Sequence, residues 1–93
     1  MTVGLVAFHY PKAEHADEMV DRVRAAADVL IGTSGCVEAT CWRESGGAVV
    51  TIGRWESEDA MKAGFAAVSA SGLDFDYDER ESRPRDVFRL VNA

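Results

Sequence analysis

Three of the four strand-like stretches in this 93-residue sequence carry apolar side chains at both sets of alternating positions. Successive side chains of a strand point to opposite faces of its sheet, so a sheet with one wet face shows apolar residues at every second position only. The stretch at residues 2–10 departs from that rule, with Val3, Leu5 and Ala7 on one side and Val6, Phe8 and Tyr10 on the other. Both faces of the predicted sheet therefore need cover.

Two segments with helical periodicity lie between the strand-like stretches. From about residue 13 to residue 31, apolar residues recur at steps of three and four, which is typical of an amphipathic helix. Its predicted buried stripe is Ala16, Met19, Val20, Val23, Ala27, Leu30 and Ile31. The second helix is predicted from Ser57, a favourable N-cap, to about Ala70. Its predicted buried stripe is Met61, Gly64, Phe65 and Val68.

Strands are predicted at residues 2–10, 37–44, 48–55 and 86–92, and the middle two form a hairpin around a short glycine-containing turn. The order is βαββαβ, and a chain of this length has room for one core, so residues 1–93 are predicted to form a single domain. Right-handed crossovers place both helices on the same face of one antiparallel sheet. The predicted fold class is therefore α+β and ferredoxin-like, with four antiparallel strands.

The second face of this sheet has no helix left to cover it. If this face were uncovered, its exposed apolar area would exceed the few hundred Å² that is usual for a monomer. An identical chain is the simplest cover. We therefore predict a homodimer in which the sheets of the two chains face each other.

Composition narrows the classes of partner. The formal net charge of −6 at pH 7 argues against nucleic acid and anionic lipid as partners. The start of the sequence lacks a signal-peptide pattern, and no apolar run approaches the roughly 18 residues of a membrane span. We therefore expect a cytoplasmic protein that does not enter membranes, with Cys36 and Cys41 as free thiols.

Metal and cofactor motifs are incomplete in this sequence. DFDYDERE, residues 74–81, has the spacing of a calcium-binding loop, but Glu79 stands where that loop needs glycine and Arg85 where it needs glutamate. The two cysteines lack the further ligands of a zinc site, and no phosphate loop or dinucleotide fingerprint is present. We expect no metal and no cofactor, and we interpret residues 74–81 as a solvated loop with Phe75 and Tyr77 at the lip of a pocket.

A family resemblance rests on three features that follow one another along the chain. A glycine precedes Cys36 at the start of a strand, the glycine hairpin follows, and AVVTIGRWESEDAMKAGF (residues 48–65) then runs from a strand into a helix. Together they resemble the antibiotic biosynthesis monooxygenase family over nearly the whole chain. The resemblance implies a dimeric α+β barrel with a pocket in each subunit between sheet and helices. Residues 48–65 are similar to the cofactor-free monooxygenases of aromatic polyketide pathways, which implies a cofactor-independent monooxygenase acting on a phenolic, quinol or polyketide-like aromatic.

Four residues are candidates for binding such a substrate. The resemblance places Trp55 where the polyketide oxygenases carry a pocket tryptophan, Thr51 where they carry an asparagine, and Met61 where they carry a tyrosine. Thr51 and Trp55 share strand parity and point to one side of the sheet; if that side faces the helices, Met61 and Phe65 are their predicted neighbours. A flat apolar slot with one hydroxyl and one indole N–H suits an aromatic ligand. The alternative is that Trp55 only fills the core.

His9 is the candidate catalytic residue, because a neutral imidazole can act as a general base toward a phenol. Loss of the phenol proton raises the electron density from which oxygen accepts an electron. The alternative is a structural histidine that is hydrogen-bonded near Pro11. Since this chain lacks the asparagine and the tyrosine of the polyketide oxygenases, a second function stays open: a non-catalytic small-ligand-binding or structural dimer of the same fold.

Overall fold

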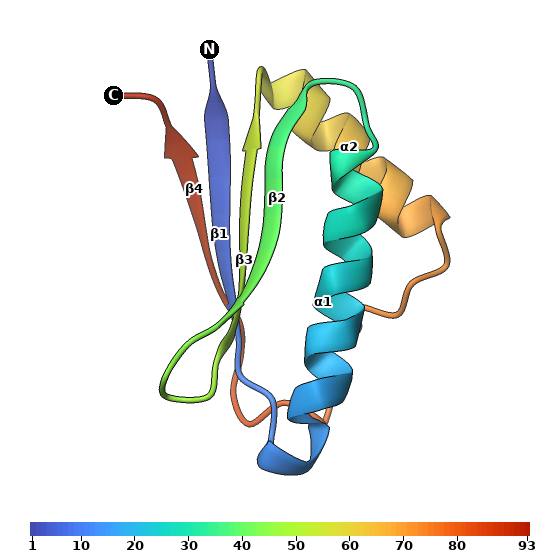
Figure 1. The fold of residues 1–93 in the computed structure, drawn as a ribbon, viewed down its shortest axis with the longest axis vertical. Coiled ribbons are helices and arrows are strands. Elements are labelled where there is room, and N and C mark those ends of the chain that lie inside the picture. The colour runs from blue at the N-terminus through green and yellow to red at the C-terminus, as the bar shows by residue number, and fades with distance from the viewer.

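The computed structural model describes residues 1–93 and has the predicted element order (Figure 1). The strands are β1 (Val3–His9), β2 (Cys36–Arg43), β3 (Val49–Trp55) and β4 (Asp86–Val91). The helices are α1 (Ala16–Ile31), α2 (Glu58–Ala70) and a short 3₁₀ helix, η1 (Ala13–His15). The strands form one antiparallel sheet in the order β2-β3-β1-β4, which confirms the predicted ferredoxin-like fold class.

The helices begin and pack largely as their sequence patterns indicate. The Ser57 Oγ accepts a hydrogen bond of 3.1 Å from the backbone N–H of Ala60, which confirms the predicted N-cap of α2. The predictions that Ile31 and Phe65 belong to the buried stripes are wrong, because Ile31 is about half exposed and Phe65 is 37% exposed. The buried side of α1 is centred on Val23 and Leu30 and includes Ala26 instead, so Ile31 lies at the edge of that side. No helix has both the length and the hydropathy that crossing a membrane requires.

The core lies between the sheet and the two helices. Its larger cluster of buried residues comprises Leu5, Ala7, Ala26, Leu30, Trp55, Met61 and Val68. A smaller cluster comprises Met19, Val20, Val23 and Val49. Both clusters use the side of β1 and β3 that faces the helices, and Figure 1 shows α1 and α2 together on that side.

The opposite side of the sheet, called the outer face here, is not covered by any helix of the chain. Its main apolar side chains are Val6, Phe8, Trp42, Val50, Ile52, Phe88 and Leu90. Trp42, Phe88 and Leu90 are each at least half exposed. Phe8 and Phe88 pack edge to face, with ring centroids 6.2 Å apart. The sheet is therefore apolar on both faces, as predicted from the alternation in the sequence.

Strand β4 is exposed along its whole length. It pairs with β1 at the edge of the sheet, beyond the strands on which α1 packs. As a result Val87, which points toward the helix side, has no helix over it and is more than half exposed. The gap in the helical layer beside β4 is where the candidate site lies.

Candidate active site

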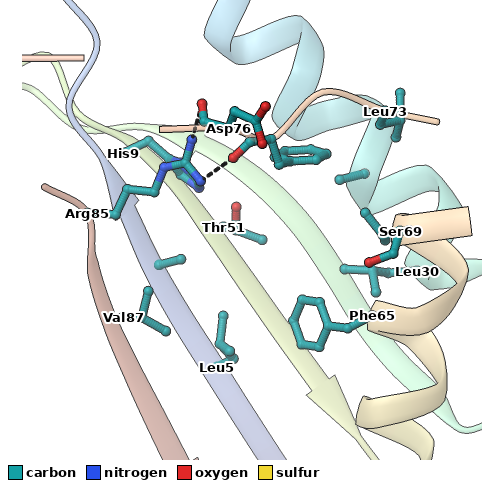
Figure 2. A pocket seen from close by; sticks show the side chains of 14 residues that line it. Leu5, His9, Leu30, Thr51, Phe65, Ser69, Leu73, Asp76, Arg85 and Val87 are labelled. Carbon is teal, nitrogen blue, oxygen red and sulfur yellow. Dashed lines mark hydrogen bonds between the residues drawn. The ribbon is translucent and has the colours of Figure 1, made fainter. Parts of the chain in front are cut away.

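A cavity of about 530 Å³ lies between the helix-facing side of the sheet and the segment that follows α2 (Figure 2). It is lined by 14 residues, nine of them hydrophobic. The main apolar walls are Leu5, Ala7, Leu30, Phe65, Val68 and Val87. This volume is within the range of about 300–1,000 Å³ that is usual for small-molecule sites.

The polar residues of the cavity gather largely at one end. Figure 2 shows His9, Asp76 and Arg85 together there, with Leu5 and Phe65 at a distance from them. His9 is the last residue of β1, and Arg85 directly precedes β4. Because β1 and β4 are antiparallel with Phe8 opposite Asp86, the end of one strand lies beside the start of the other. The register of β4 on β1 therefore brings His9 and Arg85 together.

A buried ion pair joins Arg85 to Glu81 at this end of the cavity. The Nε of Arg85 donates to Oε1 of Glu81 at 3.0 Å, and Nη2 donates to Oε2 at 2.7 Å. Nη1 donates to the backbone carbonyl of Phe75 at 2.7 Å, and Nη2 also donates to that of Asp76 at 3.2 Å. The Glu81 side chain is fully buried, so its carboxylate depends on this guanidinium for charge compensation.

His9 is buried, at 6% exposure, and its imidazole makes no hydrogen bond within the chain. Its Nδ1 lies 4.0 Å from Oε1 of Glu81, which is too far for a hydrogen bond. The pKa of His9 is lowered to about 4, mainly by burial and then by the positive charge of Arg85, while the negative charge of Glu81 opposes the shift. The imidazole is therefore neutral at pH 7. Since buried polar atoms almost always have partners, the unpaired Nδ1 marks this end of the cavity as a place for chemistry.

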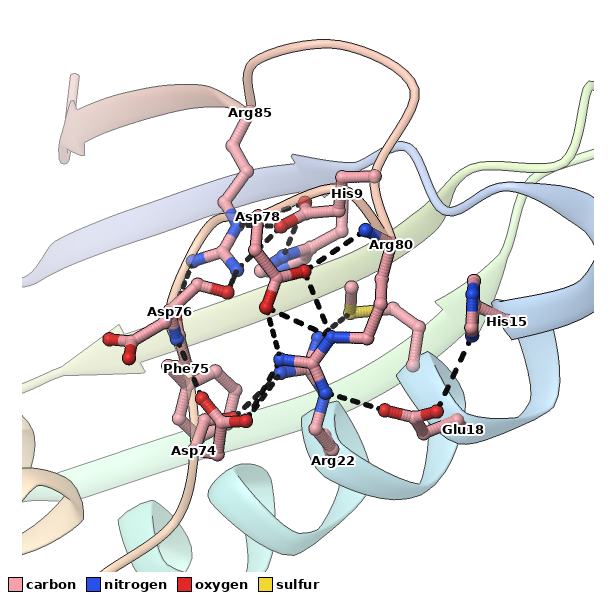
Figure 3. Close-up of polar contacts among 12 residues, drawn as sticks. His9, His15, Glu18, Arg22, Asp74, Phe75, Asp76, Asp78, Arg80 and Arg85 are labelled. Atoms are coloured by element: carbon pink, nitrogen blue, oxygen red, sulfur yellow. Dashed lines mark hydrogen bonds and ion pairs between the residues drawn. The ribbon is translucent and has the colours of Figure 1, made fainter.

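A second arginine fixes the segment between α2 and β4 over the protein surface (Figure 3). Arg80 donates to Glu18 at 2.6 Å, to Asp74 at 2.8 Å and to Asp78 at 2.7 Å. These contacts lower the pKa of Asp78 to about 2 and lower the pKa values of Glu18 and Asp74 as well. Asp74 and Asp78 of the calcium-like stretch thus pair with Arg80. Phe75 lies at the lip of the cavity as predicted, whereas the prediction for Tyr77 is wrong, because its side chain is about half exposed and does not line the cavity.

The predicted site residues fall into two groups. His9, Thr51 and Phe65 line the cavity, and Phe65 is 37% exposed there. Trp55 is 0% exposed and Met61 is also buried, so both lie in the core behind the wall. The rings of Trp55 and Phe65 are 5.6 Å apart, and the indole Nε1 has no hydrogen-bond partner. Contact between Trp55 or Met61 and a ligand stays a prediction.

Two glycines explain how the indole of Trp55 is buried so completely. A Cβ on Gly53 would overlap the six-membered ring of the indole, and a Cβ on Gly64 would lie 3.2 Å from Nε1. Any larger residue at either position would push against a ring that has no room to move. The two glycines therefore allow β3 and α2 to pack closely around the indole of Trp55.

Sequence reasoning missed the roles of Asp76, Glu81 and Arg85. They lie in or beside a polar segment without periodicity, which gives no indication of where its side chains point. The sequence contained one weak indication, which was opposite charge: Glu81 and Arg85 are four residues apart and can form an ion pair in many conformations. Only the pairing of β4 with β1 places that pair beside His9.

Comparison with known proteins identifies the family. The family model described as antibiotic biosynthesis monooxygenase matches residues 2–65. The chain belongs to this family. The part of the chain that matches the antibiotic biosynthesis monooxygenase family includes His9, Thr51, Trp55 and Phe65. The segment that carries Arg85 lies outside the match.

Solved structures show the same fold over almost the whole chain. Rv0793 from Mycobacterium tuberculosis is 18% identical with a TM-score of 0.79, and the alignment covers 100% of this chain and 96% of that one. PA3566 from Pseudomonas aeruginosa is 14% identical with a TM-score of 0.79, covering 99% and 94%. A variant of SnoaB, a cofactor-independent oxygenase from Streptomyces nogalater, is 17% identical with a TM-score of 0.71, covering 98% and 92%. A comparison with curated proteins found no match.

Proposed function

We propose that the chain is a cofactor-independent monooxygenase that oxidises a phenolic, quinol or polyketide-like aromatic in the cavity between sheet and helices. The observation that carries the proposal is an apolar cavity of about 530 Å³ with a buried, neutral and unpaired imidazole at one end. Membership of the antibiotic biosynthesis monooxygenase family supports monooxygenase chemistry in general.

The cavity suits an aromatic ring with a hydroxyl group. Leu5, Phe65 and Val87 offer apolar surface for the ring. Thr51 also lines the cavity, and no hydrogen bond within the chain occupies its side chain. A ligand hydroxyl that points toward His9 would satisfy the imidazole, and Thr51 would hold a second oxygen.

The reaction balances with oxygen as the only co-reactant. A phenol with a free para C–H gives up four electrons and becomes a quinone. One oxygen atom of O₂ becomes the new carbonyl oxygen, and the other leaves as water with the two hydrogens lost from the phenol. The substrate supplies all of the reducing power, so the protein has to supply orientation, a dry site and a place for the proton.

His9 is proposed to accept that proton at the moment of electron transfer. A base with a pKa of about 4 is too weak to take the proton beforehand, because the transfer from a phenol of pKa about 10 would cost about 8 kcal/mol. Once an electron has passed to oxygen, the hydroxyl of the oxidised ring is strongly acidic. A neutral imidazole hydrogen-bonded to it then takes the proton downhill, and the proton leaves with the water.

Oxygen uptake by the purified chain tests this function. With phenols that have a free para C–H, including anthrone-type substrates, and with EDTA present and no flavin added, we expect one molecule of O₂ consumed per molecule of quinone and one labelled oxygen atom in the product. His9→Leu should lower kcat by about 10²–10⁴-fold. Because His9 titrates near pH 4, wild-type turnover should not fall between pH 6.5 and pH 5.

The control is His15→Leu, a half-exposed histidine in η1 that lies 3.6 Å from Glu18 and not in the cavity. It should leave turnover unchanged. Full turnover by a folded His9→Leu protein would remove His9 from the mechanism, and an absence of oxygen uptake with every phenol would contradict the proposed activity.

The alternative function is a non-catalytic dimer that binds a small ligand in the same cavity. It is favoured by the position of Met61, which is buried in the core and adds no polar group to the site. Saturable binding of aromatics without oxygen consumption would support it over the enzyme.

We also infer that two chains pair through the outer face of the sheet. The chain leaves Trp42, Phe88 and Leu90 exposed there, and an identical face offers a matching apolar surface. Sedimentation at micromolar concentration should give about 20 kDa, twice the chain mass of 10.1 kDa. Leu90→Asp should shift the protein to the monomer, whereas Arg89→Asp, on the other side of β4, should not. A wild-type mass near that of one chain would contradict the dimer.

A further inference from the structure

We infer that the cavity selects an aromatic ligand that carries a neutral hydrogen-bond donor and no acidic group, and that Asp76 excludes anionic ligands. The inference rests on the proposed function, because it concerns the ligand of the same cavity. It names the charge class of that ligand from the charged groups that the structure places around it.

The first step concerns the cation of the cavity, which is Arg85. Arg85 makes three hydrogen bonds of 2.7–3.1 Å to Glu81, whose side chain is fully buried. Its remaining contacts go to the backbone carbonyls of Phe75 and Asp76. The guanidinium is thus neutralised by a carboxylate and held by five hydrogen bonds to three residues, so it has little to offer to a carboxylate of a ligand.

The second step concerns Asp76, which is one of the residues that line the cavity and whose side chain is exposed at the rim. Its side chain makes no hydrogen bond and no ion pair within the chain, although its backbone N–H donates to Asp74 at 3.0 Å. Asp74 and Asp78, its acidic neighbours, are instead paired with Arg80. The uncompensated charge at the polar end of the cavity is therefore negative.

The third step concerns the neutral polar groups. His9 is held in its neutral form by burial, and its unpaired Nδ1 is nine-tenths buried beside the cavity. A neutral imidazole has one nitrogen that accepts a hydrogen bond, and a phenol hydroxyl can donate to that nitrogen whereas a carboxylate cannot. An anion would have to shed its water against apolar walls, near Asp76 and beside an Arg85 that is already paired with Glu81.

The segment that decides this selection lies outside the family match. Asp76, Glu81 and Arg85 all follow residue 65, where the match to the family ends. The residues that would carry the oxidation are inside the match, whereas those that set the charge of the site belong to the part of the chain beyond it.

Binding of naphthol and naphthoate to the full-length protein tests the inference, because the two ligands share a ring system and differ in charge at pH 7. By titration calorimetry we expect naphthol to bind at least about 30-fold more tightly. Asp76→Asn should raise the affinity for naphthoate about threefold to tenfold and change that for naphthol less than twofold. The increase in naphthoate affinity caused by Asp76→Asn should become smaller as salt is added, because Asp76 is exposed and salt screens its charge.

Glu79→Gln is the matched control, since Glu79 is an exposed acidic residue of the same segment that does not line the cavity. It should leave both affinities unchanged. Glu81→Gln provides a second variant, because it frees the charge of Arg85 and should raise the affinity for naphthoate at least about tenfold.

The outcomes separate the two proposals. The inference is supported if the wild-type protein binds naphthol more tightly than naphthoate and if Asp76→Asn and Glu81→Gln each raise the affinity for naphthoate. Equal or tighter binding of naphthoate by the wild-type protein, or no response to Asp76→Asn, overturns the charge selection and leaves the proposed function standing. If neither naphthol nor any other aromatic binds, the proposed function fails together with the inference.

Discussion

Trp55→Ala is expected to lower the free energy of unfolding by about 3–5 kcal/mol, the largest loss that a single core substitution is expected to cause in this chain. Trp55 is fully buried, and it packs between β3 and α2 against Gly53, Gly64 and Phe65. Removing the indole leaves a void that these backbones are too rigid to fill. Because a small domain is stable by about 5–15 kcal/mol in total, the loss is a large share of its stability.

Urea denaturation measures this effect, with Phe65→Ala as the matched control. Phe65 touches the same indole but is 37% exposed, so its truncation should cost clearly less than that of Trp55. Equal losses for the two variants would contradict the assignment of Trp55 as the centre of the core.

A milder change separates the structural role of Trp55 from a role in binding. Trp55→Phe keeps a smaller aromatic ring and removes the indole N–H, which has no partner in the structure. The fold should survive this change. If the N–H contacts a ligand, aromatic binding and turnover should fall at least about tenfold, as expected for loss of a hydrogen bond. Unchanged binding would restrict Trp55 to the core.

Arg85→Met is expected to cost about 3–5 kcal/mol, because it leaves the carboxylate of Glu81 buried without a counter-charge. The methionine retains much of the length of the arginine stem, so the loss reports the charge and the hydrogen bonds more than the packing. The same substitution also releases the backbone carbonyls of Phe75 and Asp76 and should loosen the segment that closes the polar end of the cavity.

Arg89→Met is the control, since Arg89 is an exposed arginine of β4 whose ion pair with Glu58 has a distance of 3.8 Å. Exposed pairs of this kind contribute about 0–1 kcal/mol. The double variant Arg85→Met with Glu81→Leu should recover most of the loss, because no charge remains buried. A loss below about 1 kcal/mol for Arg85→Met would show that water reaches Glu81.

Local patterns were enough to predict the elements of the fold. The apolar residues at steps of three and four indicated α1, and Ser57 marked the start of α2, because helix periodicity and capping depend only on neighbours along the chain. The apolar residues on both sides of β1 indicated a sheet that needs cover on two faces. Residues 2–65, which carry these patterns, are also those that match the family.

The depth of Trp55 was not decided by the sequence. Strand parity correctly placed Trp55 and Thr51 on one side of β3, which the structure shows to be the helix side, but it allowed either of them to reach a cavity. Packing against Gly53 and Gly64 buries the indole completely, whereas Thr51 remains at the cavity wall. How far a side chain is covered depends on the separation of a strand and a helix, which no pattern along one strand contains.

The sequence by itself determined which segments become strands and helices and that both faces of the sheet are apolar. Tertiary structure alone decided the polar end of the site, where His9, Glu81 and Arg85 come from opposite ends of the chain. They meet because β4 pairs antiparallel with β1, so that Asp86 lies opposite Phe8. The physical reason is that periodicity is a local property, whereas burial and charge compensation depend on groups brought together by the register of distant strands.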